Sequence, residues 1–452
     1  MADEKRWILN AFSMSSPTHV AADYWIELAE ILDGNFHALF LADMLGVYDV
    51  YKGPENIREV IPGAAQFPIS DPSIPIAAMA AATRSLSFGV TASTTYESPF
   101  LLARRYATLD HLTNGRIAWN VVTSYLPSAA KNLGLEQEIN HDERYAIADE
   151  FLEVVYKLLE GSWRDDAVRL DPDAMEYADP DGVRRIDHVG KYFKVAGPHL
   201  VEPSRQRTPF IFQAGASKAG KEFATKHAEA MFLPGMEIAT VKRTVDDIRA
   251  TARAQGRDPA GIKLLVGMLV IVDKTDEMAR AKYDEYLSYA DLDGTLALFG
   301  GWTGTDLGGF ADDDDLKFSG PGAIQSMVSS WSAQIPGSDN LRWTKKRVAQ
   351  ELSLGGPHPR AVGSAQTVAD TLQSWVDEAD VDGFNISYAV GPGDLEDVAR
   401  YLVPELKRRG VFWDAAIAEG RTTRENYLGT FSPDGRLSED HPGSQYKWKS
   451  GK

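Results

Sequence analysis

Cysteine is absent from all 452 residues of this sequence. Its absence excludes disulfide bonds, thiolate metal sites and a cysteine nucleophile. Long apolar runs are also missing, because the sequence nowhere reaches the roughly 18 consecutive apolar residues expected of a membrane-spanning helix. The first residues, MADEKRWILNAF, show no basic region followed by an apolar stretch. We therefore expect no membrane association and no targeting segment, and we predict a cytoplasmic protein.

Basic residues are scarce relative to acidic ones: 47 lysines and arginines stand against 65 aspartates and glutamates, a net charge of −18. Nucleic acids and anionic membranes need basic patches, so neither is an expected partner. The nine histidines show no HxH or HExxH spacing, and His358 stands alone between two prolines. No metal site is predicted, because no ligand pair has metal-binding spacing. The sequence also has no GxSxG elbow and no P-loop after a strand.

The sequence does contain short β-rich runs that alternate with amphipathic helical stretches, such as residues 142–160, 217–228 and 395–409. This alternation is typical of a parallel sheet with crossover helices. Eight such β/α units in one chain favour an α/β fold closed as a TIM-like (β/α)8 barrel over an open sheet. The expected strands cover residues 7–14, 38–43, 87–95, 117–124, 209–216, 230–235, 262–273 and 383–390.

Two intervals interrupt the β/α rhythm. Residues 161–208 are rich in Asp, Pro and Gly, and residues 292–362 contain GGWTGTDLGG and ADDDD. Each lies between a helix and the next strand, so both are predicted to be insertions into one barrel domain spanning residues 1–410. Residues 411–452 have few apolar periodicities. We interpret them as a C-terminal extension that wraps the surface or a neighbouring subunit.

Polar residues gather at the predicted strand ends, where the functional loops of such barrels begin. Asp43 closes the second strand, Thr91 lies in the third and Ser124 ends the fourth. Gln213 and the sequence Gly-Ala-Ser217 lead into a helix N-terminus, which suits an anion because free N–H groups meet the positive end of the helix dipole. Ordinary strand propensity or a simple helix N-cap explains the same residues equally well.

A second helix start, HDERY, places His141, Arg144 and Tyr145 on one face. Arginine suits a phosphate, and the two ring side chains could bind a ribityl chain or stack on a ring. A charge cluster facing water is the alternative interpretation of these residues.

Several long segments of the sequence are similar to those of a known family: TASTTYESP, LDHLTNGRIAWNVVTS, NHDERYAIADEFLEV and VDGFNISYAVGPG. Across nearly the whole chain the sequence resembles the nitrilotriacetate/dibenzothiophene-sulfone monooxygenase branch of the bacterial luciferase-like family, especially its dimethyl-sulfide and long-chain alkane monooxygenases. The resemblance implies a barrel that uses FMN as FMNH2, forms a C4a-(hydro)peroxyflavin with O2 and oxygenates a substrate. It also implies an NAD(P)H-dependent flavin reductase as partner. We expect a homodimer or homotetramer.

The resemblance also assigns roles to individual positions. The residues matching the family's FMN contacts are Asp43, Thr91, Ser124, His141, Tyr145 and Ser217, with Arg144 at the phosphate. The residues that it places near the reactive edge of the flavin are His19, Tyr48, Gln66 and Tyr125.

The substrate is expected to be small and apolar or organosulfur, with long-chain alkanes, sulfones and aminopolycarboxylates as alternatives. Relatives carry a loop with a Gly-x-Trp-Arg-His-Pro core after the first strand, whereas here His19 runs almost directly into AADYWIELAEIL. In relatives this loop helps to cover the pocket, so we expect the shorter loop to affect both the activity and the range of substrates. A deazaflavin-dependent dehydrogenase, and a flavin-binding relative without oxygenase activity, are the other classes that the sequence allows.

Overall fold

A closed barrel of eight parallel strands forms the centre of the computed structural model, which describes residues 5–15, 21–215, 217–316, 342–414, 419–429, 432 and 434–448. The predicted (β/α)8 barrel is confirmed. The ring runs β10-β9-β4-β3-β2-β1-β13-β11 and closes where β11 pairs with β10. Its strands are β1 (Ile8–Met14), β2 (Ala38–Ala42), β3 (Ser87–Ser93), β4 (Ile117–Val122), β9 (Phe210–Gln213), β10 (Ala230–Leu233), β11 (Lys263–Asp273) and β13 (Gly383–Ser387).

A ninth strand, β12 (Arg360–Ser364), lies outside the ring and pairs with the C-terminal half of β11. The sequence did not predict it, because these five residues, RAVGS, have no apolar run and fall in an interval interpreted as an insertion. β11 is 11 residues long. It therefore has room to pair with β13 through Leu265–Leu269 and with β12 through Leu269–Asp273.

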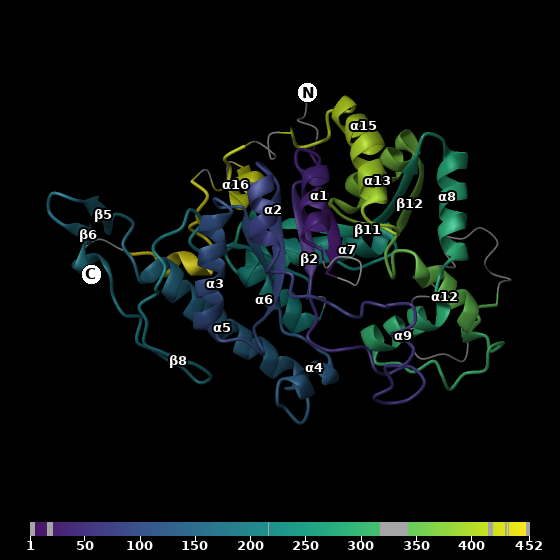
Figure 1. The fold of residues 1–452 in the computed structure, drawn as a ribbon, viewed down its shortest axis with the longest axis horizontal. Coiled ribbons are helices and arrows are strands. Elements are labelled where there is room, and N and C mark those ends of the chain that lie inside the picture. The colour runs from purple at the N-terminus through teal and green to yellow at the C-terminus, as the bar shows by residue number, and fades with distance from the viewer. Residues whose placement is uncertain are drawn as a thin grey trace.

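Helices surround the ring and bury an apolar layer against its outer face (Figure 1). The predicted helices at 142–160 and 217–228 are found as α5 (His141–Gly161) and α6 (Lys218–His227). The other covering helices are α1 (Ala22–Leu32), α2 (Ile76–Ala82), α3 (Pro99–Leu112), α7 (Ile238–Ala254), α8 (Asp276–Ser288) and α13 (Ala365–Ala379).

The helix predicted at 395–409 is divided in three. A π-helical segment, η4 (Val398–Leu402), separates α14 (Gly393–Asp397) from α15 (Val403–Arg408). Pro404 lies two residues after the end of this segment. Proline has no N–H to donate and its ring clashes with the preceding turn, so a regular ladder of hydrogen bonds cannot continue through it.

The base of the barrel is filled by the C-terminal segment. Helix α16 (Thr423–Leu428) brings Tyr427 among the inward-facing aromatic side chains of β9, and the Tyr427 hydroxyl donates to Asn10. Arg424 is fully buried and its Nε donates to Glu229 Oε1 at 2.6 Å. The tail was predicted to wrap the surface or a neighbouring subunit, and in the described part of it α16 packs against the N-terminal ends of the strands.

The two irregular intervals lie at different ends of the molecule. In the first, β5 (Val168–Asp171) pairs with β6 (Glu176–Ala178), and this hairpin projects from the body at the left of Figure 1. The second contains α9 (Leu292–Thr303) and α12 (Lys345–Ser353), which lie with α4 (Pro127–Asn132) at the end of the barrel opposite α16 (Figure 1). The short remaining elements are β7 (His188–Val189), β8 (Lys194–Val195), η1 (Pro180–Gly182), η2 (Pro259–Gly261) and η7 (Pro442–Tyr446).

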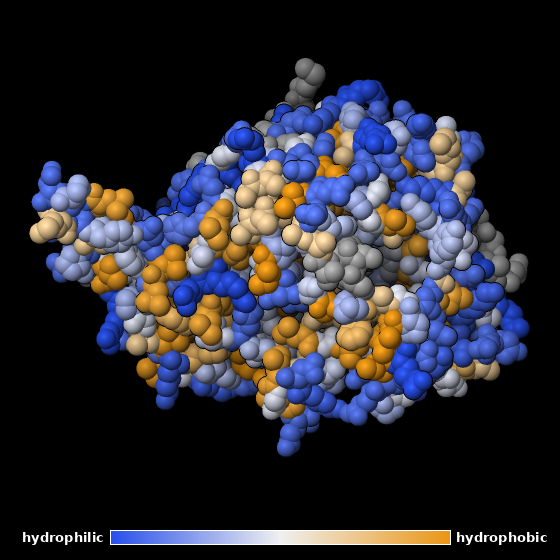
Figure 2. Space-filling model, in the orientation of Figure 1, coloured by the Kyte–Doolittle hydropathy of each residue, from blue (hydrophilic) through white to orange (hydrophobic). Residues whose placement is uncertain are grey.

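The surface is mostly polar, with apolar side chains gathered at the lower left of Figure 2, over α3 and α5. Leu101 and Leu112 on α3 are 59% exposed each. Within the residues that the structure describes, no helix is both long and apolar enough to cross a membrane.

Candidate active site

A cavity of about 630 Å³ opens at the C-terminal ends of the barrel strands. Parallel strands direct their carboxyl ends and the following loops to one rim, so residues distant in sequence meet there. The lining residues are Asp43, Met44, Leu45, Val121, Val122, Thr123, Ser124, Tyr125, Leu126, Ala129, His141, Arg144, Tyr145, Gln213, Ala214, Gly215, Ser217 and Trp302. Seven of the positions to which the resemblance assigns roles are among them, namely Asp43, Ser124, Tyr125, His141, Arg144, Tyr145 and Ser217, and Gln213, selected at a strand end, lines the cavity too.

One wall of the cavity is the N-terminus of α6. Ser217 is the N-cap of this helix, and its Oγ accepts from the Gly220 N–H at 3.0 Å. A Cβ on Gly215 would lie 2.8 Å from Gly220 Cα, and a Cβ on Gly220 would lie 2.7 Å from the Tyr145 hydroxyl. Glycine is therefore required at both positions. The backbone of the loop and the first turn of the helix thus form a cradle with free N–H groups.

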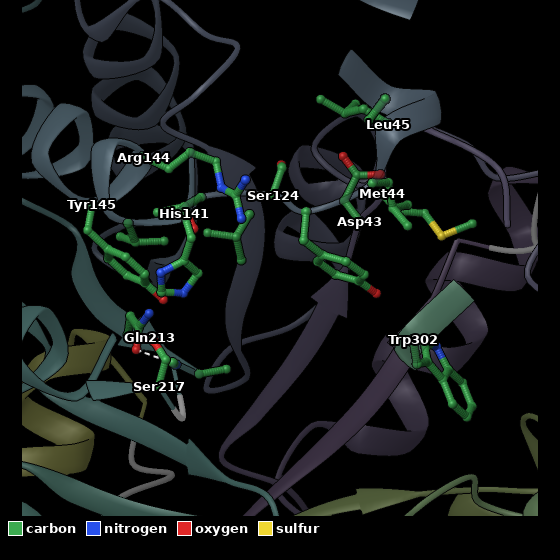
Figure 3. Close-up of a pocket in the computed structure, with 18 residues that line it drawn as sticks. Asp43, Met44, Leu45, Ser124, His141, Arg144, Tyr145, Gln213, Ser217 and Trp302 are labelled. Atoms are coloured by element: carbon green, nitrogen blue, oxygen red, sulfur yellow. Dashed lines mark hydrogen bonds between the residues drawn. The ribbon is translucent and has the colours of Figure 1, made fainter. Parts of the chain in front are cut away.

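Arg144 on α5 lies beside this cradle. Its side chain is almost buried, with 7% of the residue exposed, and its Nη1 donates to the Ile139 carbonyl at 2.5 Å and to Glu138 Oε2 at 3.1 Å. Its Nε is buried and has no hydrogen-bond partner among the described residues. In Figure 3 the side chain extends into the cavity toward Ser124. A guanidinium that lines the same cavity as a helix N-terminus fits a phosphate group.

His141 and Tyr145 occupy the same helix face as Arg144, as the spacing predicted. Their rings meet edge to face, with centroids 5.2 Å apart, and Tyr145 packs on Phe223 of α6 at 5.7 Å. Asn140 caps α5 by accepting from the Asp142 N–H at 3.1 Å. The cap fixes where the helix begins, so His141 stands at the rim of the cavity (Figure 3).

Ser124 follows β4 in a left-handed backbone conformation, with a φ of 55°. This region costs a residue with a Cβ about 1–3 kcal/mol, and such strain is common at binding sites. The Ser124 hydroxyl donates to Ser93 Oγ at 2.9 Å. Thr91 lies deeper in the barrel: its hydroxyl donates to the Leu41 carbonyl and accepts from Asn120 Nδ2, both at 2.9 Å. It does not line the cavity.

Asp43 comes directly after β2 and forms part of the cavity wall there. Burial is the main cause that raises the pKa of its carboxyl to about 6, and the nearby Asp71 carboxylate acts in the same direction. The carboxyl group therefore changes protonation state close to physiological pH.

The opposite wall is aromatic. Trp302 of α9 faces the cavity across from His141, Arg144 and Tyr145 (Figure 3), and its Nε1 donates to the Tyr48 hydroxyl at 3.0 Å. Tyr48 is 5% exposed, whereas Tyr125 is 48% exposed and lies close enough to Tyr48 to raise its pKa. Burial raises the pKa of both tyrosines, so both are neutral O–H groups at physiological pH.

Of the predicted catalytic positions that the structure describes, Tyr125 lines the cavity, whereas Tyr48 and Gln66 are not among the lining residues. Gln66 lies in the connection between β2 and α2, with a φ of 53°. His19 lies outside the described residues, in the connection between β1 and α1. Sequence reasoning did not select Trp302, because GGWTG lies in an interval that was interpreted as an insertion. The one signal for it was a large aromatic residue beside glycines.

This barrel with a polar rim matches the family model for luciferase-like monooxygenase over residues 8–382. The chain belongs to that family, and it is therefore an enzyme of a monooxygenase class. It is 46% identical to the dimethyl-sulfide monooxygenase of Hyphomicrobium sulfonivorans, over 98% of this chain and 94% of that protein. It is 45% identical to the long-chain alkane monooxygenase of Geobacillus thermodenitrificans, over 98% of both chains.

Solved structures agree with this assignment. The crystal structure of DmoA from Hyphomicrobium sulfonivorans superposes with a TM-score of 0.91 at 45% identity, covering 98% of this chain and 96% of that one. A riboflavin lyase, solved with modified FMN and riboflavin, superposes with a TM-score of 0.84 at 33% identity, covering 98% of this chain and all of that one.

Proposed function

We propose that this protein is the oxygenase component of a two-component system, which binds reduced FMN and uses O2 to oxygenate a small organosulfur compound. The dimethyl-sulfide monooxygenase relative supports the substrate class. An FMNH2-dependent dimethylsulfone monooxygenase from Pseudomonas putida, 34% identical over 43% of this chain, supports the reduced state of the flavin.

The observation that carries the proposal is that Arg144 and the N-terminus of α6, with Ser217 as its N-cap, line the same cavity. A phosphate monoester supplies several acceptor oxygens and negative charge, which suit both a guanidinium and a helix N-terminus. The terminal phosphate of FMN has this chemistry, and riboflavin lacks it.

Each wall then has its own task. Arg144, Ser217 and the α6 backbone would hold the phosphate, and His141 and Tyr145, which line the same cavity, would contact the ribityl chain. Reduced FMN supplies the electrons with which O2 is activated, because no side chain can do so. On the far wall, Tyr125 donates a hydrogen bond where oxygen is reduced, and Tyr48 orients the Tyr125 hydroxyl.

The apolar part of the cavity excludes water from the reacting atoms. Met44, Leu45, Leu126 and Trp302 all contribute side chains to it. A dry pocket favours transfer of oxygen to an apolar substrate over loss of the oxygen as H2O2. These side chains offer neither charge nor, apart from the Trp302 indole N–H, a hydrogen-bonding group. They therefore suit a small sulfide better than an aminopolycarboxylate.

A separate NAD(P)H-dependent flavin reductase in the cytoplasm would supply FMNH2, by diffusion. The oxygenase must then bind reduced FMN more tightly than the oxidised product, which has to leave after each turnover. An anaerobic titration that shows equal or reversed affinity for the two redox states would contradict this part of the proposal.

The test of the reaction is oxygen uptake with a generic flavin reductase, NADH and FMN. Dimethyl sulfide, hexadecane, dibenzothiophene sulfone and nitrilotriacetate are offered separately, and substrate loss and H2O2 release are measured against a reaction without the protein. We expect substrate loss with dimethyl sulfide and a matching fall in H2O2. If hexadecane is the only compound consumed, the protein would be assigned instead as an alkane monooxygenase. Complete recovery of the electrons as H2O2 with every compound would contradict oxygenase activity, and hydride transfer with a reduced deazaflavin under nitrogen would indicate a dehydrogenase.

A further inference from the structure

Trp302 lines the cavity on the side that lies away from Arg144. Figure 3 shows its indole on one side of the cavity, with His141, Arg144 and Tyr145 on the other. Met44 lies on the same side as Trp302 in this view. The Arg144 side therefore offers a cation and hydrogen-bonding groups, whereas the Trp302 side offers two large apolar side chains. A molecule with one anionic end and one apolar end has one favourable orientation in such a cavity.

The Trp302 ring is held in place by contacts with two other segments. Its Nε1 donates to the Tyr48 hydroxyl at 3.0 Å, and the two rings stand nearly perpendicular, with an interplanar angle of 83°. A Cβ on Gly301 would overlap the Tyr48 ring, so this ring packs directly on the helix that carries Trp302. A Cβ on Gly356 would lie 3.2 Å from Trp302 Cη2, so the far edge of the indole packs on the Gly356 backbone. The indole therefore has little freedom to move aside.

The segment against which the indole packs has no side chains at the point of contact. Gly355 and Gly356 both adopt left-handed conformations, with φ values of 81° and 62°. A Cβ on Gly355 would lie 2.6 Å from Leu269 Cβ, so this turn sits tightly on β11. The indole thus touches the cavity on one side and a glycine backbone on another. Removal of the indole would extend the cavity toward this backbone.

Trp302 is less able to adapt to a larger ligand than the neighbouring apolar residues of the wall. Met44 has an unbranched side chain with several rotatable bonds, so it changes shape easily. Leu45 is 39% exposed, so it has room to turn toward solvent. The indole is fixed by packing and by a hydrogen bond, and close-packed groups accept even one additional methylene only at a cost. A ligand that is too long for the cavity therefore meets a rigid limit at Trp302.

We propose that Trp302 sets the size limit of the substrate, so that the cavity accepts sulfides with short alkyl groups and excludes long alkyl chains. This inference rests on the proposed function, since the flavin phosphate is assigned to the Arg144 side and the substrate to the Trp302 side. It narrows the substrate class to short-chain sulfides. It also names the side chain that excludes a long-chain alkane.

The test compares the binding of dimethyl sulfide with that of dibutyl sulfide, which differs only in the length of its alkyl groups. Affinities are measured by saturation-transfer NMR titration with oxidised FMN at a saturating concentration, so no turnover is needed. The variants are Trp302→Ala, which removes the indole, and Trp302→Phe, which keeps an aromatic ring but loses the N–H. Trp163→Ala is the matched control, because Trp163 is also half-buried, donates its indole N–H to the His199 carbonyl at 2.9 Å and does not line the cavity.

We expect the wild type to prefer dimethyl sulfide and Trp302→Ala to shift the preference toward dibutyl sulfide by at least about tenfold. Each methylene that becomes buried is worth about fourfold in affinity, so the burial of two is sufficient. The space left by an indole is apolar, and such space stays dry and takes apolar ligands. Trp302→Phe should give a smaller shift than Trp302→Ala, and Trp163→Ala should keep the wild-type preference. FMN affinity should be the same in all four proteins.

Three results would overturn the size limit while FMN binds normally. The first is the same preference in the wild type and Trp302→Ala. The second is an equal shift in Trp302→Phe and Trp302→Ala, which would assign the effect to the lost N–H. The third is the same shift in Trp163→Ala. If Trp302→Ala does not fold, Trp302→Leu is judged by the same criteria. Failure of the proposed function shows instead as an absence of FMN binding to the wild type, and it would remove this inference as well.

Discussion

Trp302 donates its indole N–H to the hydroxyl of Tyr48 at 3.0 Å, although 254 residues separate them. Trp302 belongs to α9, and Tyr48 follows β2. Tyr125, after β4, lies close enough to Tyr48 to raise its pKa. Because the indole N–H is a donor only, the Tyr48 hydroxyl has to accept from it. Three segments distant in the sequence thus meet at the cavity wall.

Tyr125→Phe should leave flavin binding intact and raise the fraction of electrons lost as H2O2. The reason is that the phenol donates a hydrogen bond to reduced oxygen but contributes little to holding the ring system. The measurement is H2O2 released per NADH consumed in a reductase-coupled assay. Tyr289→Phe, at a residue that is 79% exposed, is the control. Equal H2O2 release in wild type and Tyr125→Phe would remove the catalytic role of this residue and leave the family assignment intact.

Gly220→Ala should weaken FMN binding by at least about tenfold. Alanine ordinarily stabilises a helix by up to about 1 kcal/mol relative to glycine. Here its Cβ would lie 2.7 Å from the Tyr145 hydroxyl and 2.9 Å from Gly215 Cα, so the cradle has to open. Flavin affinity is measured by fluorescence quenching and stability by thermal unfolding. Gly393→Ala, where no atom lies within 4 Å of the added Cβ, is the control. A more stable Gly220→Ala protein with normal flavin affinity would show that no cradle exists.

Asp43→Asn should stabilise the protein at pH 7–8 and have little effect near pH 4. Burial raises the pKa of the carboxyl from 3.8 to about 6. The folded state therefore favours the protonated form, and the stability from Asp43 is complete below pH 3.8 and lost as pH rises through about 6. Asparagine stays neutral throughout. Thermal unfolding of both proteins between pH 4 and pH 8 measures the difference, with the exposed Asp173→Asn as control. A difference that does not grow with pH would contradict the raised pKa.

Arg424→Leu should destabilise the fold by about 3–5 kcal/mol, because the buried Glu229 carboxylate loses its partner. Arg424 is fully buried, and its Nε and Nη2 donate to the two Glu229 oxygens at 2.6 and 2.9 Å. Arg408→Leu removes a side chain that is 68% exposed and leaves Glu405 paired with Arg409, so it should cost less than about 1 kcal/mol. Urea unfolding measures both. Addition of Glu229→Leu to Arg424→Leu should recover much of the loss. Equal costs for Arg424→Leu and Arg408→Leu would mean that α16 does not secure the barrel base.

The eight barrel strands could be predicted because each is a short apolar run in a regular alternation with helices. Their ends could not. The expected strand at 117–124 ends at Val122, since Ser124 adopts a left-handed conformation that no local pattern announces. The strand β12 was missed for a similar reason: its pairing depends on the length of β11, which is a long-range property.

The residues of the candidate site also fall into those that the sequence predicted and those that it did not. Helix starts are local, so the cavity positions of His141, Arg144, Tyr145 and Ser217 followed from capping and spacing, with the resemblance to guide the choice. Trp302 lies on a segment that looks like an insertion, and the contact with Tyr48 that holds it at the cavity is between residues distant in sequence. The burial of Arg424 was also unpredictable, because a charged residue in a tail normally faces water.

Anaerobic titration of Arg144→Ala with FMNH2 and with reduced riboflavin tests most directly whether this cavity is a flavin phosphate site. The account predicts that the variant loses about 1.5–3 kcal/mol of FMNH2 binding, the value of a charge-assisted hydrogen bond, and binds reduced riboflavin like the wild type. Arg253→Ala, on the exposed end of α7, should change neither affinity. Wild-type affinity of Arg144→Ala for FMNH2, or an equal loss for both flavins, would contradict the account.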